Sequence, residues 1–139
     1  MSAPATAVVG TVLPDRTFVI TRADLVRYCG ASGDFNVIHW NERAATQVGL
    51  PDVIAHGMFT MALAGRIVTD WVGDPGAVES YSVRFSRPVV VPDDESGATL
   101  QVGAVVDEVR EDGRAVVVLT VTVQGSKVLM AARAVVRLP

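Results

Sequence analysis

The residues best suited to acid–base chemistry lie close together in the first third of the chain. Asp34 and His39 are five positions apart, with Asn36 between them, in a segment of loop-forming residues. Helical spacing would not bring two such positions onto one face, whereas a loop can fold both side chains into one pocket. A carboxylate and an imidazole that share one water molecule can then act as an acid–base pair. Asp and Asn are also common turn residues and a histidine can be structural, so spacing alone favours a structural role.

A second candidate feature is the His56–Gly57 pair, which directly precedes the most regular helical pattern of the chain. A helix N-terminus offers free N–H groups and the positive end of the helix dipole. Both can stabilise a developing oxyanion, for example on a thioester carbonyl. Gly57 has no side chain to block the close approach of a ligand. A simple turn at the start of a helix explains the same two residues equally well, so the pattern leaves both interpretations open.

The composition of the chain narrows the class of protein. Half of the 139 residues are hydrophobic and the mean hydropathy is +0.37, so we expect a large core or apolar surface covered by a partner. The net charge of -3, without a block of like charges, argues against nucleic-acid binding. The single cysteine, Cys29, excludes an internal disulfide and favours a reducing compartment.

Nothing in the sequence predicts export or insertion into a membrane. The first ten residues lack the basic start and the long apolar stretch of a signal peptide. The most apolar window, residues 53–72, contains His56, Arg66 and Asp70, which favours a buried helix over a membrane span. We therefore expect a cytoplasmic protein that does not bind membranes.

The first half of the chain predicts mainly helices. Thr21 begins one after a short β-rich segment at 17–20, because Asp24 completes a capping box, and Gly30 is expected to end it. A loop at 31–38 and a short helix at about 41–48 follow. The strongest helix spans 57–71, where apolar side chains repeat every four residues, at Phe59, Leu63, Ile67 and Trp71.

The second half predicts strands. Segments 78–85, 100–109, 115–123 and 128–138 are rich in residues that favour strands, and Asp112–Gly113 and Gln124–Gly125 form hairpin turns between the later ones. We interpret the order as helices followed by one long antiparallel meander. A long helix against an antiparallel sheet is an α+β arrangement, and a free sheet edge would invite a second copy to pair.

Three sequence blocks resemble a known family. Residues 28–39, YCGASGDFNVIH, resemble the hydratase-2 motif of MaoC-like (R)-specific enoyl-CoA hydratases, in which an aromatic residue precedes Ser/Thr-Gly-Asp-x-Asn-Pro-x-His. Residues 54–58, IAHGM, and 83–89, VRFSRPV, resemble the second and third blocks, in the family's order. The run at 71–78, WVGDPGAV, with 54–60, is similar to the β subunits of (3R)-hydroxyacyl-ACP dehydratases of mycolic-acid elongation. Val37 stands where the motif has a proline that would stiffen the loop, but no reacting group is lost.

The resemblance implies a single hot-dog domain over residues 1–139, with an antiparallel sheet wrapped around a long central helix. It implies a hydro-lyase of fatty-acid metabolism that interconverts trans-2-enoyl and (3R)-3-hydroxyacyl thioesters of CoA or acyl-carrier protein. Asp34 and His39 would hold the water that adds to C3 and return a proton to C2. The Gly57 N–H would bind the thioester carbonyl, and Asn36 and His56 would complete the substrate-binding loop.

The same resemblance implies no metal and no cofactor, and it implies a homodimer or a heterodimer with a related hot-dog subunit. It leaves open which of Asp34 and His39 is the base. Two other functions also stay open. A hot-dog thioesterase would commonly use a carboxylate on or near the central helix, which here carries only Asp70 near its far end. A non-catalytic acyl-thioester-binding subunit would not need Asp34 and His39, so their presence favours the enzyme.

Overall fold

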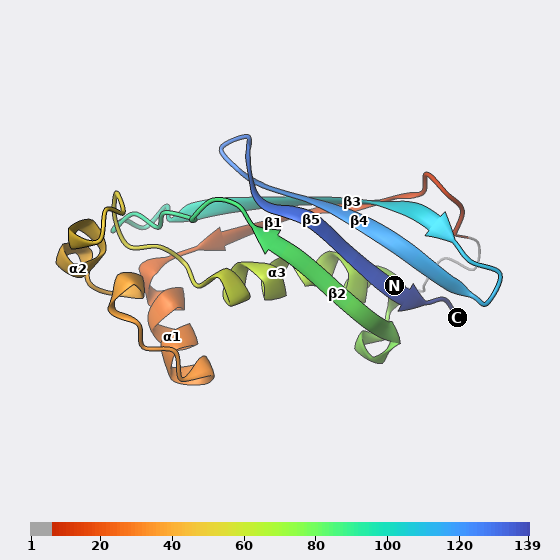
Figure 1. The fold of residues 1–139 in the computed structure, drawn as a ribbon, viewed down its shortest axis with the longest axis horizontal. Coiled ribbons are helices and arrows are strands. Elements are labelled where there is room, and N and C mark those ends of the chain that lie inside the picture. Colours follow the sequence, from red (N-terminus) through yellow and green to blue (C-terminus); the bar gives the residue numbers. More distant parts are fainter. Residues whose placement is uncertain (1–6) are drawn as a thin grey trace.

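The computed structural model describes residues 7–139, so positions 1–6 of the predicted domain lie outside the described part. The chain forms an antiparallel sheet and a few helices, as predicted for the α+β class (Figure 1). Its helices and strands, in chain order, are β1 (Val12–Ile20), α1 (Arg22–Ser32), α2 (Glu42–Gln47), α3 (Gly57–Val72), β2 (Val78–Phe85), β3 (Ala98–Val109), β4 (Arg114–Val123) and β5 (Ser126–Arg137). Short 3₁₀ turns cover Val37–His39 and Pro75–Ala77.

The five strands have the order β1-β3-β4-β5-β2, and all neighbours are antiparallel. The prediction of one long meander was therefore wrong for β2, which pairs with β5 at the far side of the sheet. Only β3, β4 and β5 form a meander. The connection from β2 to β3 is too long for a tight hairpin and contains Pro88 and Pro92. Within this connection, Val90 forms an isolated antiparallel β-bridge with Ile54, which precedes α3.

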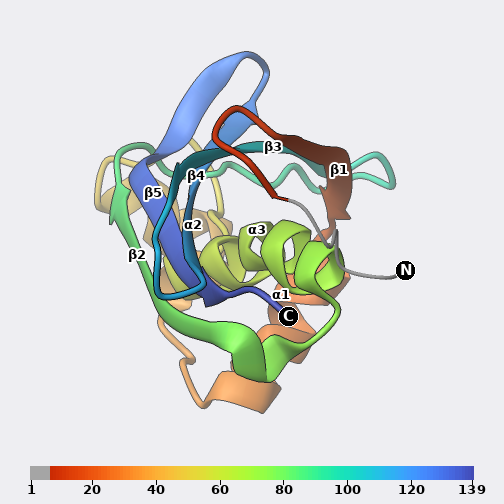
Figure 2. The same cartoon turned by 90° about the vertical axis from the view of Figure 1, so that its right-hand side faces the viewer.

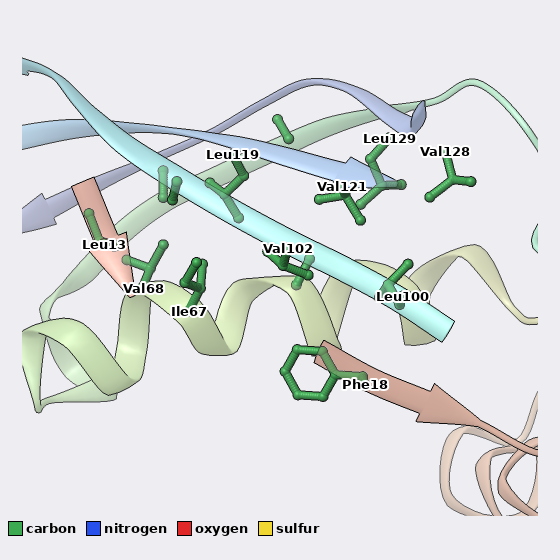
Figure 3. Close-up of a cluster of buried hydrophobic side chains, with 14 of the residues drawn as sticks. Leu13, Phe18, Ile67, Val68, Leu100, Val102, Leu119, Val121, Val128 and Leu129 are labelled. Atoms are coloured by element: carbon green, nitrogen blue, oxygen red, sulfur yellow. The ribbon is translucent and has the colours of Figure 1, made fainter. Parts of the chain in front are cut away.

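The long helix α3 lies inside the curve of the sheet (Figure 2). Its buried side chains include Ala64, Ile67, Val68 and Trp71. They face the apolar side of the strands, where Leu100, Val102, Leu119 and Val121 are buried (Figure 3). Full burial of one large aliphatic side chain contributes about 1.5–3 kcal/mol, so this layer holds α3 in place. The predicted four-residue repeat was half right, since Ile67 and Trp71 are buried but Phe59 and Leu63 are only partly buried.

The ends of α1 decide where the loop with the candidate residues begins. Thr21 and Asp24 form the predicted capping box. The helix does not end at Gly30, as predicted, but continues to Ser32. Gly33 then takes a left-handed conformation (φ 77°) and its N–H donates to the Cys29 carbonyl at 2.9 Å. Glycine adopts that conformation without steric cost, whereas Gly30 and Ala31 are tolerated inside the helix.

An arginine at the start of α1 ties the neighbouring segments together. The Arg22 guanidinium lies 3.1 Å from a Glu42 carboxylate oxygen in α2 and 3.0 Å from one of Asp52. Its Nε donates to the Val91 carbonyl at 2.6 Å. The short helix α2 is present where predicted, with the Asn41 side chain as its N-cap. These contacts hold both sides of the loop that contains Asp34 and His39.

Both predicted hairpin turns are present in the meander. Gly113 has a positive φ of 82° between β3 and β4, and Gln124 and Gly125 both have positive φ between β4 and β5. Within residues 7–139, no helix is long and apolar enough to cross a membrane.

Candidate active site

The loop after α1 sets the position of Asp34. The Ser32 hydroxyl donates to the Tyr28 carbonyl at 2.7 Å, and the Asp34 N–H donates to Ser32 Oγ at 3.1 Å. The last turn of α1 therefore fixes the backbone of Asp34. Its carboxylate side chain remains 53% exposed, so water and a ligand can reach it.

Asn36 shapes the next part of this loop. Its N–H donates to Asp34 Oδ1 at 3.1 Å, and its side-chain oxygen accepts from the Ile38 N–H at 3.3 Å. The second bond caps the 3₁₀ turn at Val37–His39, which places Val37 at the first position of the turn. Trp40 closes the loop, because its indole N–H donates to the Phe35 carbonyl at 3.0 Å.

His39 is buried, and one hydrogen bond fixes its tautomer. Nδ1 lies 2.7 Å from the Ile54 carbonyl oxygen. A carbonyl oxygen can only accept, so Nδ1 carries the proton and the neutral ring presents a lone pair on Nε2. Nε2 lies 4.0 Å from Asp34 Oδ2. The two atoms are too far apart for a direct hydrogen bond, but one water molecule between them can reach both.

His56 supports this arrangement from below the surface, with only 2% of its area exposed. Its ring stacks on His39 at a centroid distance of 3.8 Å, and Tyr28 lies edge-on to it at 4.6 Å. Nε2 lies 3.1 Å from the Asp34 carbonyl oxygen, so it acts as the donor. Burial lowers the pKa of His56 and outweighs the opposing effect of its hydrogen bond to the Asp34 carbonyl. The imidazole therefore stays neutral, with a buried Nδ1 that has no partner in the described residues.

Gly57 begins α3 directly after His56. No side chain caps this end of the helix, and the Phe59 N–H donates to the His56 carbonyl at 3.1 Å. The N–H groups of Gly57 and Met58 can therefore bind a ligand. A Cβ at position 57 would lie 2.8 Å from Phe85 Cε1. A hollow of about 410 Å³, the Gly57 hollow, opens between this turn and the end of β2, with walls that include Ile54, Gly57, Thr60, Phe85 and Val128.

The predicted residues therefore meet in space. Asp34, His39 and His56 each place a potential ligand atom within 4.8 Å of the other two, and Gly57 follows His56 directly. That spacing would also admit a small cation, so the expected absence of a metal stays a prediction. Asn36 contacts the Asp34 carboxylate and the loop backbone.

The Ile54 carbonyl, which orients His39, has no signal in the sequence, because any residue type can supply a backbone oxygen. Phe85, whose ring lies against Gly57, is a further site residue that was not predicted. Phe85 belongs to the third sequence block, which was the available signal.

A curved antiparallel sheet around a long helix defines a hot-dog protein, and its imidazole–carboxylate pair beside an uncapped helix N-terminus is its candidate active site. The sequence model described as the MaoC-like domain matches residues 5–127. The chain therefore belongs to the MaoC-like dehydratase family, as the three sequence blocks predicted.

Relatives with known names agree with this membership. The chain is 46% identical over 79 residues to 3-hydroxyacyl-thioester dehydratase X of Mycobacterium tuberculosis, a match that covers 57% of this chain and 27% of that protein. It is 31% identical over 122 residues to 3-hydroxybutyryl-CoA dehydratase of Methylorubrum extorquens, covering 86% of this chain and 74% of that protein. The chain thus spans only about a quarter of the length of the first relative. The finer likeness to the mycolic-acid β subunits stays a prediction.

Solved structures share the fold over nearly the whole chain. A MaoC-like dehydratase superposes with a TM-score of 0.94 at 40% identity, covering 99% of this chain and 42% of that one. The (R)-hydratase from A. caviae superposes with a TM-score of 0.84, covering 98% of this chain and all of that one. Its identity of 23% supports the fold alone.

Proposed function

We propose that the chain is a hydro-lyase that interconverts trans-2-enoyl and (3R)-3-hydroxyacyl thioesters. The observation that carries the proposal is the hydrogen bond of His39 Nδ1 to the Ile54 carbonyl, which directs Nε2 toward the Asp34 carboxylate at 4.0 Å. Two acceptor atoms at this separation suit one water molecule that donates one proton to each. Family membership and the names of the relatives support the same reaction class.

In the hydration direction, the oxygen of this water bonds to C3 of the enoyl thioester. One proton of the water passes to the Asp34–His39 pair, and the electrons of the C2–C3 double bond move toward the thioester carbonyl. The resulting enolate collects a proton from the pair at C2, so that one water has been added. Because both transfers use the same pair, the hydroxyl and the proton add to the same face. Dehydration follows the same steps in reverse.

The first turn of α3 would stabilise the charge of the enolate. The Gly57 N–H would donate to the thioester oxygen, and the helix dipole of a 16-residue helix adds positive potential there. Asn36 and His56 would act as positioning residues, since both contact Asp34 and neither presents a reacting group to the water. The thioester would belong to CoA or to acyl-carrier protein, and no cofactor is required for this chemistry.

We further propose that the chain works as a homodimer or as a heterodimer with a related hot-dog subunit. Strand β2 is at the edge of the sheet and pairs only with β5 among the described residues, so its other edge can accept a strand. A relative from M. tuberculosis, 31% identical over 87 residues, is named 3-oxo-4,17-pregnadiene-20-carboxyl-CoA hydratase beta subunit. Light scattering on the purified chain, alone and with a related subunit, tests this assembly, and a monomer in both samples would refute it.

The catalytic proposal is tested by the loss of enoyl absorbance when the protein meets crotonyl-CoA and longer 2-enoyl-CoA substrates. Asp34→Asn and His39→Ala should each lower kcat by about 10²–10⁴-fold, the usual contribution of a positioned acid or base. Asp107→Asn, the same chemical change on an exposed residue of β3, is the matched control. Unchanged melting temperatures would show that the variants are folded. Wild-type activity in Asp34→Asn would refute the assigned pair.

Two alternatives predict different outcomes of this assay. A non-catalytic acyl-thioester-binding subunit would bind acyl-CoA but leave every substrate unchanged, even when a related subunit is supplied. A thioesterase would release free CoA. The second alternative has less support, because the one carboxylate on α3, Asp70, lies near the far end of the helix and pairs with Arg16.

A further inference from the structure

Two hollows follow one another along the same side of α3. The Gly57 hollow touches the first turn of the helix and Phe85 at the end of β2. A second hollow of about 240 Å³, the inner hollow, lies farther along the helix. Its walls are mainly apolar and include Ala62, Gly65, Arg66, Val78, Tyr81 and Ala134.

Two aromatic rings of β2 pack against α3, one beside each hollow. Phe85 lies against Gly57, and Tyr81, four residues earlier in β2, lies against Gly65. A Cβ at Gly65 would be 2.9 Å from Tyr81 Cε2, so the glycine makes room for the ring. The Tyr81 hydroxyl donates to the Met61 carbonyl at 2.7 Å. The ring therefore reaches back along the helix from Gly65 to Met61, and of the two hollows it lines the inner one.

The Tyr81 ring is held firmly in this position. It is half-buried, and burial raises the pKa of its hydroxyl to about 12, so the group stays a proton donor to Met61 at any ordinary pH. Met61 is flanked along α3 by Thr60, which lines the Gly57 hollow, and by Ala62, which lines the inner hollow. Along α3, the hydrogen bond of Tyr81 to Met61 thus lies between the helix residues that line the one hollow and those that line the other.

We propose that Tyr81 determines acyl-chain length by closing the Gly57 hollow against the inner hollow. The inference rests on the proposed function, in which the thioester carbonyl binds at Gly57. An acyl chain that starts there would lie in the Gly57 hollow, and the Tyr81 ring would block its continuation along the helix into the inner hollow. Without that ring, the chain would continue into the inner hollow beside Gly65, which lies about 12 Å farther along the helix axis at ~1.5 Å per residue.

The occupant follows from the position and the chemistry of the walls. The hollows lie on one side of a helix whose first N–H groups would hold the thioester, so a chain attached to that thioester is the ligand nearest to them. Ala62, Val78 and Ala134 offer the inner hollow apolar contacts, which suit methylene groups. Thr69 and Arg66 are its polar side chains other than the Tyr81 hydroxyl, which is engaged with Met61. Arg66 lines this hollow and is exposed, so its guanidinium provides a polar boundary toward solvent.

Two substitutions of Tyr81 distinguish a role in chain-length selection from a purely structural role in holding β2 against α3. Tyr81→Ala removes the ring and joins the hollows. Tyr81→Phe keeps the ring but removes the hydrogen bond to Met61, and it serves as the matched control. The measured quantity is the ratio of kcat/KM for long and short 2-enoyl-CoA substrates, from four to sixteen carbons. One methylene in an apolar pocket changes kcat/KM by about 10–200-fold.

We expect the kcat/KM of the wild type to fall steeply beyond one chain length. Tyr81→Ala should raise the ratio of kcat/KM for substrates longer than this to kcat/KM for shorter ones by about 10-fold or more. Tyr81→Phe should keep the wild-type ratio. Equal losses for all substrates in Tyr81→Ala, or the same shift in both variants, would overturn the proposal.

A second series makes the test independent of turnover. Calorimetry with saturated acyl-CoAs of the same lengths should show tighter binding of the longer chains by Tyr81→Ala than by the wild type. If the wild type turns over no substrate, the proposed reaction fails while these dissociation constants still decide the role of Tyr81. Dissociation constants with the same length dependence in the wild type and Tyr81→Ala would overturn that role.

Discussion

Replacement of Gly57 by alanine tests the link between the start of α3 and the chemistry. The new Cβ would lie 2.8 Å from Phe85 Cε1, 3.0 Å from Cδ1 and 3.2 Å from Cζ, so the ring must move. Phe85 is 52% exposed and can turn outward. Crowding of this kind costs about 1–3 kcal/mol. Alanine in place of glycine in a helix stabilises the folded state by about 1 kcal/mol. We therefore expect a loss of at most about 2 kcal/mol in the free energy of unfolding.

The effect on catalysis should be much larger than the effect on folding. The added methyl group and the displaced ring occupy the wall of the hollow next to the N–H that would hold the thioester oxygen. Loss of one such donor lowers kcat by about 10²–10³-fold, or about 2.7–4 kcal/mol of transition-state stabilisation. Gly57→Ala should therefore remain folded at the assay temperature and lose most of its hydratase activity.

Initial rates with crotonyl-CoA and thermal unfolding should be measured for Gly57→Ala and for the double variant Gly57→Ala/Phe85→Ala. Gly30→Ala in α1 is the matched control, because a Cβ there meets no atom within 4 Å. The double variant should recover stability but not kcat. Wild-type kcat in Gly57→Ala would refute the assignment of the carbonyl site. Full recovery of kcat in the double variant would show that Phe85 displacement alone caused the loss.

Two further predictions concern the loop and its support. Val37→Pro should raise the free energy of unfolding by about 0.4–1 kcal/mol in a denaturant titration, since Val37 begins a 3₁₀ turn and Asn36 already has an extended ψ of 127°. Val48→Pro is the contrasting variant and should destabilise, because the Val48 N–H donates to Thr46. The lowered pKa of His56 means that the unfolded chain binds more protons there than the folded chain does. Stability should thus fall as pH drops from about 6.5 toward the lowered pKa, and His56→Phe should flatten this dependence; an equally steep fall in that variant would contradict the assignment.

The sequence by itself determined the features that depend on neighbours along the chain. The capping box of Thr21 and Asp24, the long helix after His56 and the two hairpin turns were predicted correctly, since each rests on local backbone preferences. The spacing of Asp34, Asn36 and His39 indicated a loop that could gather polar side chains. It could not choose between a structural and a chemical role, and only the resemblance to a family favoured the chemical one.

The tertiary structure alone decided the features that depend on distant partners. The position of β2 beside β5, the partner of Nδ1 in His39 and the contact of Tyr81 with Met61 all join segments far apart in sequence. Strand order is set by which apolar faces pack around α3, and a backbone carbonyl such as that of Ile54 has no signature in the residue type. The sequence therefore indicated which groups could react, whereas packing fixed the tautomer and orientation in which they meet.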